Sequence, residues 1–188
     1  MTNRSRRLAP RGEAGQTMVE TVAALFIIGI GLVAVIALLL RANTSVGVGK
    51  DRNVALTVAD SYLEDIRARP YDDITLTSPP TPSTDQNHPN SSVTGTTYRY
   101  DPSKPPEPLV LNPARTTGLS PGPLSFPPGP IKGEVYRYVT CVDDAATPDV
   151  QDYKRVTVVA RWMGGPPAPS KQVKITSVVV PAEAQTPC

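Results

Sequence analysis

The sequence predicts an α+β fold in which one long N-terminal helix packs on a small C-terminal antiparallel sheet. Two observations predict the helix: an uncharged apolar run over residues 21–40, and a helical spacing of apolar residues over 41–69. Alternating strand patterns, by contrast, occur only in the last third of the chain. Residues 70–133 between them are rich in proline, which suits neither a helix interior nor a central strand.

The apolar run from Thr21 to Leu40 contains twenty residues and no charge. At a rise of about 1.5 Å per residue, such a helix is about 30 Å long, the hydrocarbon thickness of a bilayer. Four arginines and one glutamate give residues 1–15 a net charge of +3, which leaves −1 for residues 16–188 out of the formal total of +2. Positive charge before a span keeps that end in the cytoplasm, so the C-terminal domain is expected outside it.

Three kinds of segment have to be distinguished at this end of the chain. A cleaved secretory signal has a shorter apolar core, of about 7–15 residues, and a small-x-small cleavage site after it. The sequence Arg41-Ala42-Asn43-Thr44 supplies no such site. A plain single-pass anchor explains the length and the arginines, but it leaves Glu20 without a purpose, because an ionisable side chain at a membrane span is costly and requires a partner.

The third kind explains the carboxylate. The basic leader Met1–Gly15, the Gly15–Gln16 junction, Glu20 and the apolar run together resemble the class III signal of type IV pilins and pseudopilins. Residues 17–19 also match the usual pattern of that signal. The departure is Gln16, which stands where phenylalanine is commonest.

The resemblance implies a function in assembly. In this family a prepilin peptidase cuts after the glycine on the cytoplasmic side and methylates the new N-terminus, and the apolar helix becomes the core of a filament. Gly15 would then precede the cut, Gln16 would be the N-methylated first residue, and Glu20 the fifth. Glu20 is able to pair with the α-amino group of a neighbouring subunit and so fix the register between subunits.

The partners that the resemblance implies are prepilin peptidase, other pilin subunits, the pilus assembly machinery and, before assembly, the membrane. No cofactor is expected, and the chain is expected to be no enzyme. The N-terminus would face the cytoplasm, and the protein would move from the inner membrane into an extracellular filament.

Residues 41–69 are expected to continue the helix in amphipathic form. Their apolar stripe consists of Ala55, Leu56, Ala59, Tyr62, Leu63 and Ile66. Pro70 ends the helix by about Arg69, and a bend is expected at Val46–Gly49. Within the apolar run, Gly29 and Gly31 fit either close helix–helix packing or local softening of the helix.

Residues 79–130 contain 14 of the 22 prolines. We expect residues 70–133 to form a long irregular connection with one candidate strand, Val93–Tyr100, and we expect His88 to be an exposed loop residue. The connection serves either as a surface loop or as a variable face that contacts neighbours or a target. Because aromatic residues make up only 5% of the chain, the core is expected to be small and aliphatic.

The segment 134–188 contains three predicted strands, Glu134–Val142, Tyr153–Trp162 and Lys171–Val180. The turn residues Gly164–Pro167 make the last two a hairpin. The resulting sheet offers one face to the helix stripe. The order of helix, loop and strands also matches pilin-like proteins, and it resembles minor pilins and I-type pseudopilins more than major pilins.

Cys141 and Cys188 are the only cysteines. Outside the cytoplasm they are expected to form one disulfide, which would stabilise the head by about 4 kcal/mol for a loop of this length. Together with the single histidine they are too few for a metal site.

Four aspartates fall between the first two predicted strands: Asp143, Asp144, Asp149 and Asp152. Such a loop is either a calcium site, since calcium binds converging carboxylate oxygens, or a solvated acidic turn. The sequence contains no phosphate-binding loop and no HExxH motif.

Three classes of function therefore remain. The first is a structural filament subunit, belonging either to a type IV pilus used in motility or competence or to a type II secretion pseudopilus. The second is a tip adhesin or a DNA-uptake subunit, although a near-neutral head predicts no specific nucleic-acid partner. The third is a membrane-anchored enzyme, for which no candidate site is found.

Overall fold

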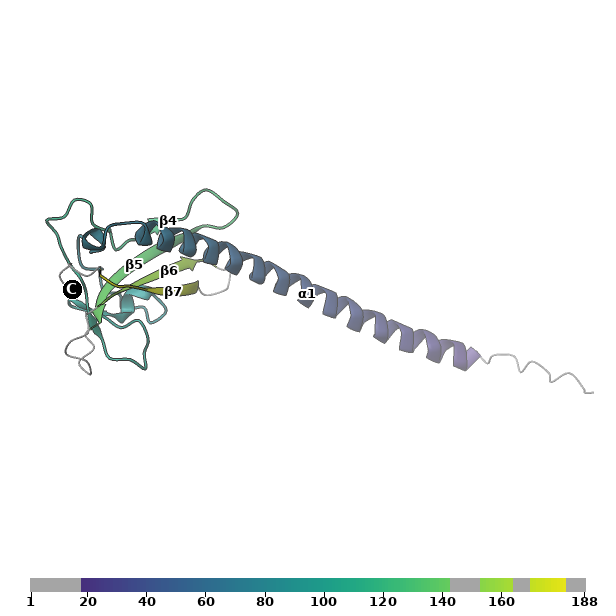
Figure 1. Ribbon diagram of the computed structural model, residues 1–188. Helices are drawn as coiled ribbons and strands as arrows, with labels where there is room; N and C mark the ends of the chain where they lie inside the picture. The colour runs from purple at the N-terminus through teal and green to yellow at the C-terminus, as the bar shows by residue number, and fades with distance from the viewer. Residues whose placement is uncertain (1–17, 143–152, 164–169, 182–188) are drawn as a thin grey trace, which may run out of the picture. The chain divides into compact units, whose positions relative to one another are not determined.

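The computed structural model describes residues 18–142, 153–163 and 170–181 (Figure 1). The chain divides into two units, residues 1–47 and 48–188. Helix α1 (Met18–Arg67) is 50 residues long and belongs to both, and its C-terminal part packs on the sheet of the second unit, the head. The predicted α+β class and its long N-terminal helix are confirmed.

The main sheet of the head is antiparallel throughout, with the order β4-β5-β6-β7. Its strands are β4 (Leu124–Ser125), β5 (Gly133–Val142), β6 (Tyr153–Trp162) and β7 (Lys171–Val179). The three predicted strands are confirmed to within one residue at each end, and β6 and β7 pair as a hairpin. Strand β4 was not predicted, because two residues are too few to show an alternation.

The contact between α1 and the sheet is made by the predicted stripe. Ala55, Ala59, Leu63 and Ile66 are buried, with Ala55, Ala59 and Ile66 fully so, and these positions recur every three or four residues on one side of the helix. The helix ends at Arg67, close to the predicted end. Helix α1 is continuous through Val46–Gly49, and the bend expected there stays a prediction.

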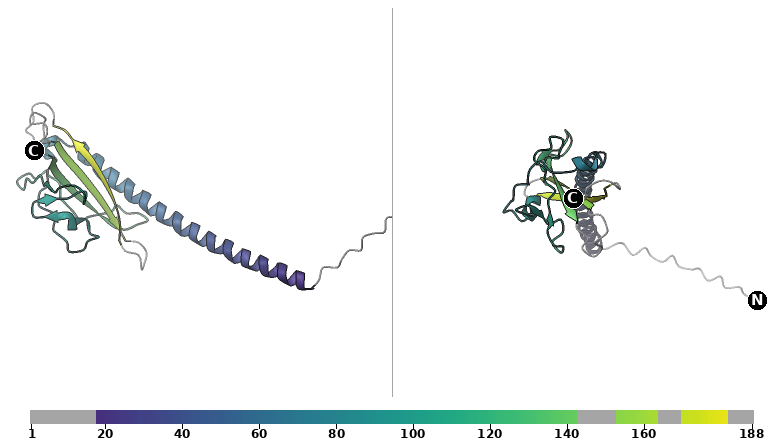
Figure 2. Two further views of the ribbon diagram at one scale, coloured as in Figure 1. Left: turned by 90° about the horizontal axis from the view of Figure 1, so that it is seen from below. Right: turned by 60° about the vertical axis from the view of Figure 1, so that its left-hand side comes forward.

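Both faces of the central strands are buried, and the helix stripe covers one of them as expected. Val135–Thr140 of β5 and Val156–Ala160 of β6 contain no exposed residue. Arg137 lies on one face of β5, and its guanidinium is 6.0 Å from the ring of Tyr62 in α1. The neighbouring residues Tyr138 and Thr140 point to the other face and bond to the proline-rich segment. This segment therefore forms a second layer on the sheet (Figure 2).

The second layer contains a small sheet, ordered β1-β2-β3, and two short 3₁₀ helices. These elements are η1 (Tyr71–Asp73), η2 (Pro89–Ser92), β1 (Val93–Thr94), β2 (Thr97–Tyr98) and β3 (Glu107–Pro108). The prediction of one strand over Val93–Tyr100 was wrong. The chain turns back at Gly95, whose φ of +59° suits the first position of a two-residue type II′ hairpin turn.

The proline-rich segment also pairs with the outer edge of β5. The Val110 N–H donates to the Val139 carbonyl over 2.9 Å, and the Arg137 N–H donates to the Pro121 carbonyl over 2.8 Å. Proline lacks a donor but keeps its acceptor, so prolines at an edge are compatible with this pairing. Gly122, with φ +104°, is needed here because a Cβ would lie 2.5 Å from the Val135 carbonyl oxygen.

Tyrosines join the two layers, so the core is not only aliphatic, as was expected, but also contains buried aromatic rings. Tyr98 and Tyr138 stack with their ring centroids 3.8 Å apart, and both are almost completely buried. The Tyr138 hydroxyl donates to Asn90 Oδ1 over 2.6 Å. Burial raises the pKa of both tyrosines, so their hydroxyls stay protonated and remain available as donors.

We predict that Tyr138→Phe lowers the free energy of unfolding of the head by about 1–3 kcal/mol, because Asn90 Oδ1 loses its partner in a buried position. Trp162, the only tryptophan and 3% exposed, reports the transition through its fluorescence in chemical denaturation of the detergent-solubilised chain. Tyr62→Phe, at a half-buried position, is the matched control and should stay within about 0.5 kcal/mol. Equal effects of the two substitutions would contradict this account.

Candidate functional site

The N-terminal part of α1 is the first candidate site. Every residue from Met18 to Leu40 is exposed in the single chain, including all of its large apolar side chains. In the described part of the chain, α1 is the one helix long and apolar enough to cross a membrane, and none of its apolar window is buried. A continuous apolar surface of this size is stable only against lipid or other apolar protein surfaces.

Glu20 lies in the first turn of α1 and is exposed. Its side chain therefore lies at the N-terminal end of the apolar surface. Gly15 and Gln16, the predicted cleavage and methylation positions, lie outside the described residues, so these assignments stay predictions.

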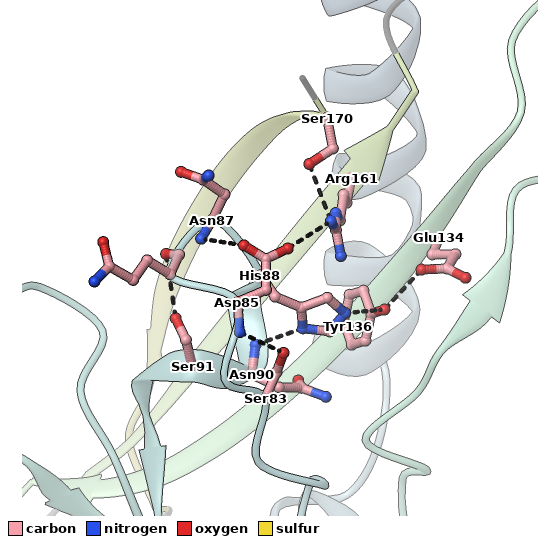
Figure 3. Close-up of polar contacts among 11 residues, drawn as sticks. Ser83, Asp85, Asn87, His88, Asn90, Ser91, Glu134, Tyr136, Arg161 and Ser170 are labelled. Carbon is pink, nitrogen blue, oxygen red and sulfur yellow. Dashed lines mark hydrogen bonds and ion pairs between the residues drawn. The ribbon is translucent and has the colours of Figure 1, made fainter. Parts of the chain in front are cut away.

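The second candidate site is a polar cluster between the second layer and the central strands β5 and β6, centred on His88 (Figure 3). His88 caps the 3₁₀ helix η2: its Nδ1 accepts the backbone N–H of Asn90 over 3.2 Å. Its Nε2 lies 3.0 Å from the Tyr136 hydroxyl, which donates to Glu134 Oε2 over 2.7 Å. Because Nδ1 accepts, Nε2 is the protonated nitrogen and donates to Tyr136.

This geometry corrects the expectation that His88 is an exposed loop residue. The side chain is half-buried, and its ring meets that of Tyr136 edge-on with the centroids 5.1 Å apart. Burial, helped by the positive charge of Arg161, lowers the pKa of His88. Burial and the neighbouring Glu134 carboxylate raise the pKa of Tyr136 to about 12.

An ion pair closes the same cluster. Arg161 of β6 contacts Asp85 Oδ2 at 3.2 Å and donates to Ser170 Oγ over 3.0 Å. Asp85 in turn accepts the backbone N–H of Asn87 through Oδ1. The cluster thus ties the segment 83–91 to β5, β6 and the start of β7 (Figure 3).

A buried ion pair holds the same two layers together elsewhere. Arg155 Nη1 lies 3.4 Å from Glu107 Oε1, with both side chains nearly buried, and its guanidinium stacks 3.8 Å from the ring centroid of Tyr100. Thr140 donates to the other carboxylate oxygen of Glu107 over 2.5 Å. Removing one partner of such a pair is costly, because the other charge stays buried.

On the opposite face, Lys154 packs against the segment that follows α1. Its Nζ donates to the Tyr71 carbonyl over 2.9 Å and lies 4.0 Å from the centre of the Tyr71 ring. Burial lowers the pKa of Lys154. The Lys154 ammonium group thus bonds to the backbone and packs on the ring of Tyr71, and this contact holds β6 to the segment after α1.

The remaining predicted site residues lie mostly outside the described part of the chain. Cys141 is half-buried near the end of β5 and is not a free thiol. Cys188 lies outside the described residues, so its pairing with Cys141 stays a prediction. The same holds for the calcium alternative at Asp143, Asp144, Asp149 and Asp152. Among the residues described, no group of three His, Cys, Asp or Glu side chains is placed to hold a metal ion.

Comparison with known proteins adds no relative. No protein-family model, no curated protein and no solved structure matches this chain. The long apolar helix followed by a helix–sheet head is a pilin-like architecture, and this likeness rests on the fold itself.

Sequence reasoning missed the His88 cluster. One local signal was present: His88 precedes Pro89, and a residue before proline takes an extended conformation, while proline favours the first position of a helix. The partners Glu134, Tyr136 and Arg161 are far away in sequence, and no spacing rule connects them to residue 88.

We predict that His88 makes the head less stable in weak acid. Because the pKa of His88 is lowered in the folded state, the unfolded chain binds the proton first as the pH falls below about 6.5. The free energy of unfolding therefore falls from there until the pH reaches the folded-state pKa. His88→Asn keeps an acceptor for the Asn90 N–H but does not titrate. The difference in stability between the two proteins, measured from pH 8 to pH 5, should depend on pH, and a constant difference would contradict the prediction.

We also predict a disulfide between Cys141 and Cys188. Peptide mapping of the non-reduced protein should recover one cross-linked peptide containing both residues. Cys141→Ser and Cys188→Ser should each lower the free energy of unfolding by about 4 kcal/mol, the loop-closure value, and the double variant should cost no more than either single one. Free thiols at both positions in protein isolated from the cell surface would contradict the prediction.

Proposed function

We propose that this chain is a structural subunit, a minor pilin or pseudopilin, of a type IV pilus-like filament. One observation supports this most: α1 combines a fully exposed apolar part, Met18–Leu40, with a part whose stripe Ala55–Ile66 is buried on the head. The same helix thus has one segment that its own chain covers and one that it leaves uncovered. A filament core built from neighbouring copies covers the second segment.

Processing would prepare the helix for assembly. Prepilin peptidase would remove residues 1–15 and methylate Gln16, which leaves Glu20 as the fifth residue of the mature chain. Before the cut the helix would span the inner membrane, with the arginine-rich leader in the cytoplasm and the head outside. The pilus assembly machinery would then move the helix from lipid into the filament.

Glu20 would set the register of assembly. A carboxylate among apolar helices is tolerated when an opposite charge lies beside it. The α-amino group created by the cut is such a charge, and it is the one group that every neighbouring copy presents at the same height. Pairing with it would favour a single axial offset between subunits, whereas the apolar side chains alone allow several.

Two related functions compete with this one. As a type II secretion pseudopilin, the chain would use the same helix and the same processing in a different machine. Identifying which machine's assembly ATPase co-purifies with the chain distinguishes the two functions. As a tip adhesin or DNA-uptake subunit, it would bind a target through its head. An enzymatic role has no support in the described residues.

We predict that the mature protein begins at Gln16 and carries one additional methyl group. Mass spectrometry of the membrane fraction measures both features. Gly15→Val should retain residues 1–15, because the residue before the cut is changed. A mature chain that begins anywhere else, or wild-type protein that keeps its leader, would contradict the processing step.

We further predict that Glu20→Gln lowers incorporation into sheared filaments by about tenfold or more, since loss of one partner in a buried charge pair costs about 3–5 kcal/mol. Immunoblots of the filament and membrane fractions give the ratio. Asp60→Asn removes an exposed carboxylate from the part of α1 that lies in the head and is the matched control. Unchanged incorporation of Glu20→Gln would exclude the proposed register.

A further inference from the structure

A hollow on the outer face of the small sheet carries a guanidinium without a partner. The hollow has a volume of about 340 Å³ and is lined by Ser91, Ser92, Thr94, Thr97, Arg99 and Pro106. It lies in the second layer of the head and adjoins the cluster around His88 through Ser91, whose N–H donates to the His88 carbonyl. The groups that line it take no part in the function proposed above.

The hairpin register explains why these side chains gather. Val93 pairs with Tyr98 and Thr94 with Thr97, while the Arg99 N–H donates to the Ser92 carbonyl over 3.0 Å. Because side chains alternate along a strand, Val93 and Tyr98 point to the core, and both are buried. Ser92, Thr94, Thr97 and Arg99 therefore share the outer face.

Arg99 differs from the other arginines of the head that lie beyond α1. Each of those is held by a carboxylate or a carbonyl: Arg69 by Asp65, Arg115 by Asp73, Arg137 by Ser120, Arg155 by Glu107 and Arg161 by Asp85. Among the residues that the structure describes, the Arg99 guanidinium has no hydrogen bond or ion pair. Its five donors are free to bind a planar anion through two parallel hydrogen bonds.

The hydroxyl groups complete the lining. Thr97 donates to the Thr94 carbonyl over 2.7 Å, and Ser91 donates to the Gln86 carbonyl over 3.3 Å, which leaves the lone pairs of both hydroxyls as acceptors. The hydroxyls of Ser92 and Thr94 have no partner among the described residues. The hollow thus offers one cation together with several neutral donors and acceptors.

We propose that this hollow binds a carboxylated sugar unit of an acidic polysaccharide. Arg99 takes the carboxylate, the hydroxyls of Ser92 and Thr94 bond to the sugar hydroxyls, and the Pro106 ring lies against the apolar side of the sugar. The volume is at the lower end of small-molecule sites, of about 300–1,000 Å³. A bare inorganic anion would fill only a small part of it. Nucleic acid is a poor match, because it requires several cations and aromatic platforms.

The test is binding of a galacturonate trisaccharide to the full-length protein in detergent micelles, measured by titration calorimetry. A neutral galactose trisaccharide and inorganic phosphate serve as comparison ligands. We expect the acidic sugar to bind at least tenfold more tightly than either. Equal binding of phosphate would show a general anion site and overturn the sugar assignment, and equal binding of the neutral sugar would overturn the role of the carboxylate.

Variants locate the site. Arg99→Gln should weaken binding by about tenfold or more, because a hydrogen bond to a charged group is lost. Thr94→Val should weaken it about fivefold, the effect of losing a neutral hydrogen bond. Lys104→Gln removes the same charge from an exposed position outside the lining, and it should change affinity less than about twofold.

Absence of galacturonate binding, or equal losses in Arg99→Gln and Lys104→Gln, would refute the proposal. Filament incorporation of Arg99→Gln should stay normal, which separates this test from that of the assembly function.

Discussion

The close packing of α1 on the main sheet is the contact on which the rest of the head depends. Ala55 and Ala59 are fully buried at this contact, and their small side chains let the helix backbone approach the strands. Leu63 and Ile66 extend the same stripe towards the helix end. Since the same helix continues into the apolar part, fixing its C-terminal part in the head attaches the head to whatever environment covers the apolar part.

The head needs a second cover because β5 and β6 are buried on both sides. The proline-rich segment supplies it with tyrosines, an ion pair and backbone donors placed between prolines, instead of with a second helix. Tyr138, bonded to Asn90, and Arg155, paired with Glu107, each join the main sheet to this layer. These polar contacts add to apolar packing, because Ile74, Leu76, Leu109 and Leu119 of the same segment are buried in the core.

The sequence allows the elements with strong periodicity to be predicted, and the second layer much less so. The helix, its buried stripe and the three long strands follow from spacing alone. Strand β4, the turn at Gly95 and the tyrosine stack do not, because each depends on two or three residues whose partners are distant in the chain. The site divides in the same way. Glu20 stands out against an apolar run, whereas His88 and Arg99 acquire meaning only when the fold brings Tyr136 beside one and exposes the other on a hairpin face.

The central claim is that helices of neighbouring copies cover the apolar part of α1 once the protein has left the membrane. Photo-cross-linking from a benzophenone side chain at Leu32, which is 61% exposed in the single chain, tests this most directly. In the sheared filament fraction we expect cross-links to the helix of another subunit, and in the membrane fraction cross-links to lipid. Cross-links to lipid alone, with no protein adduct outside the membrane, would contradict the account.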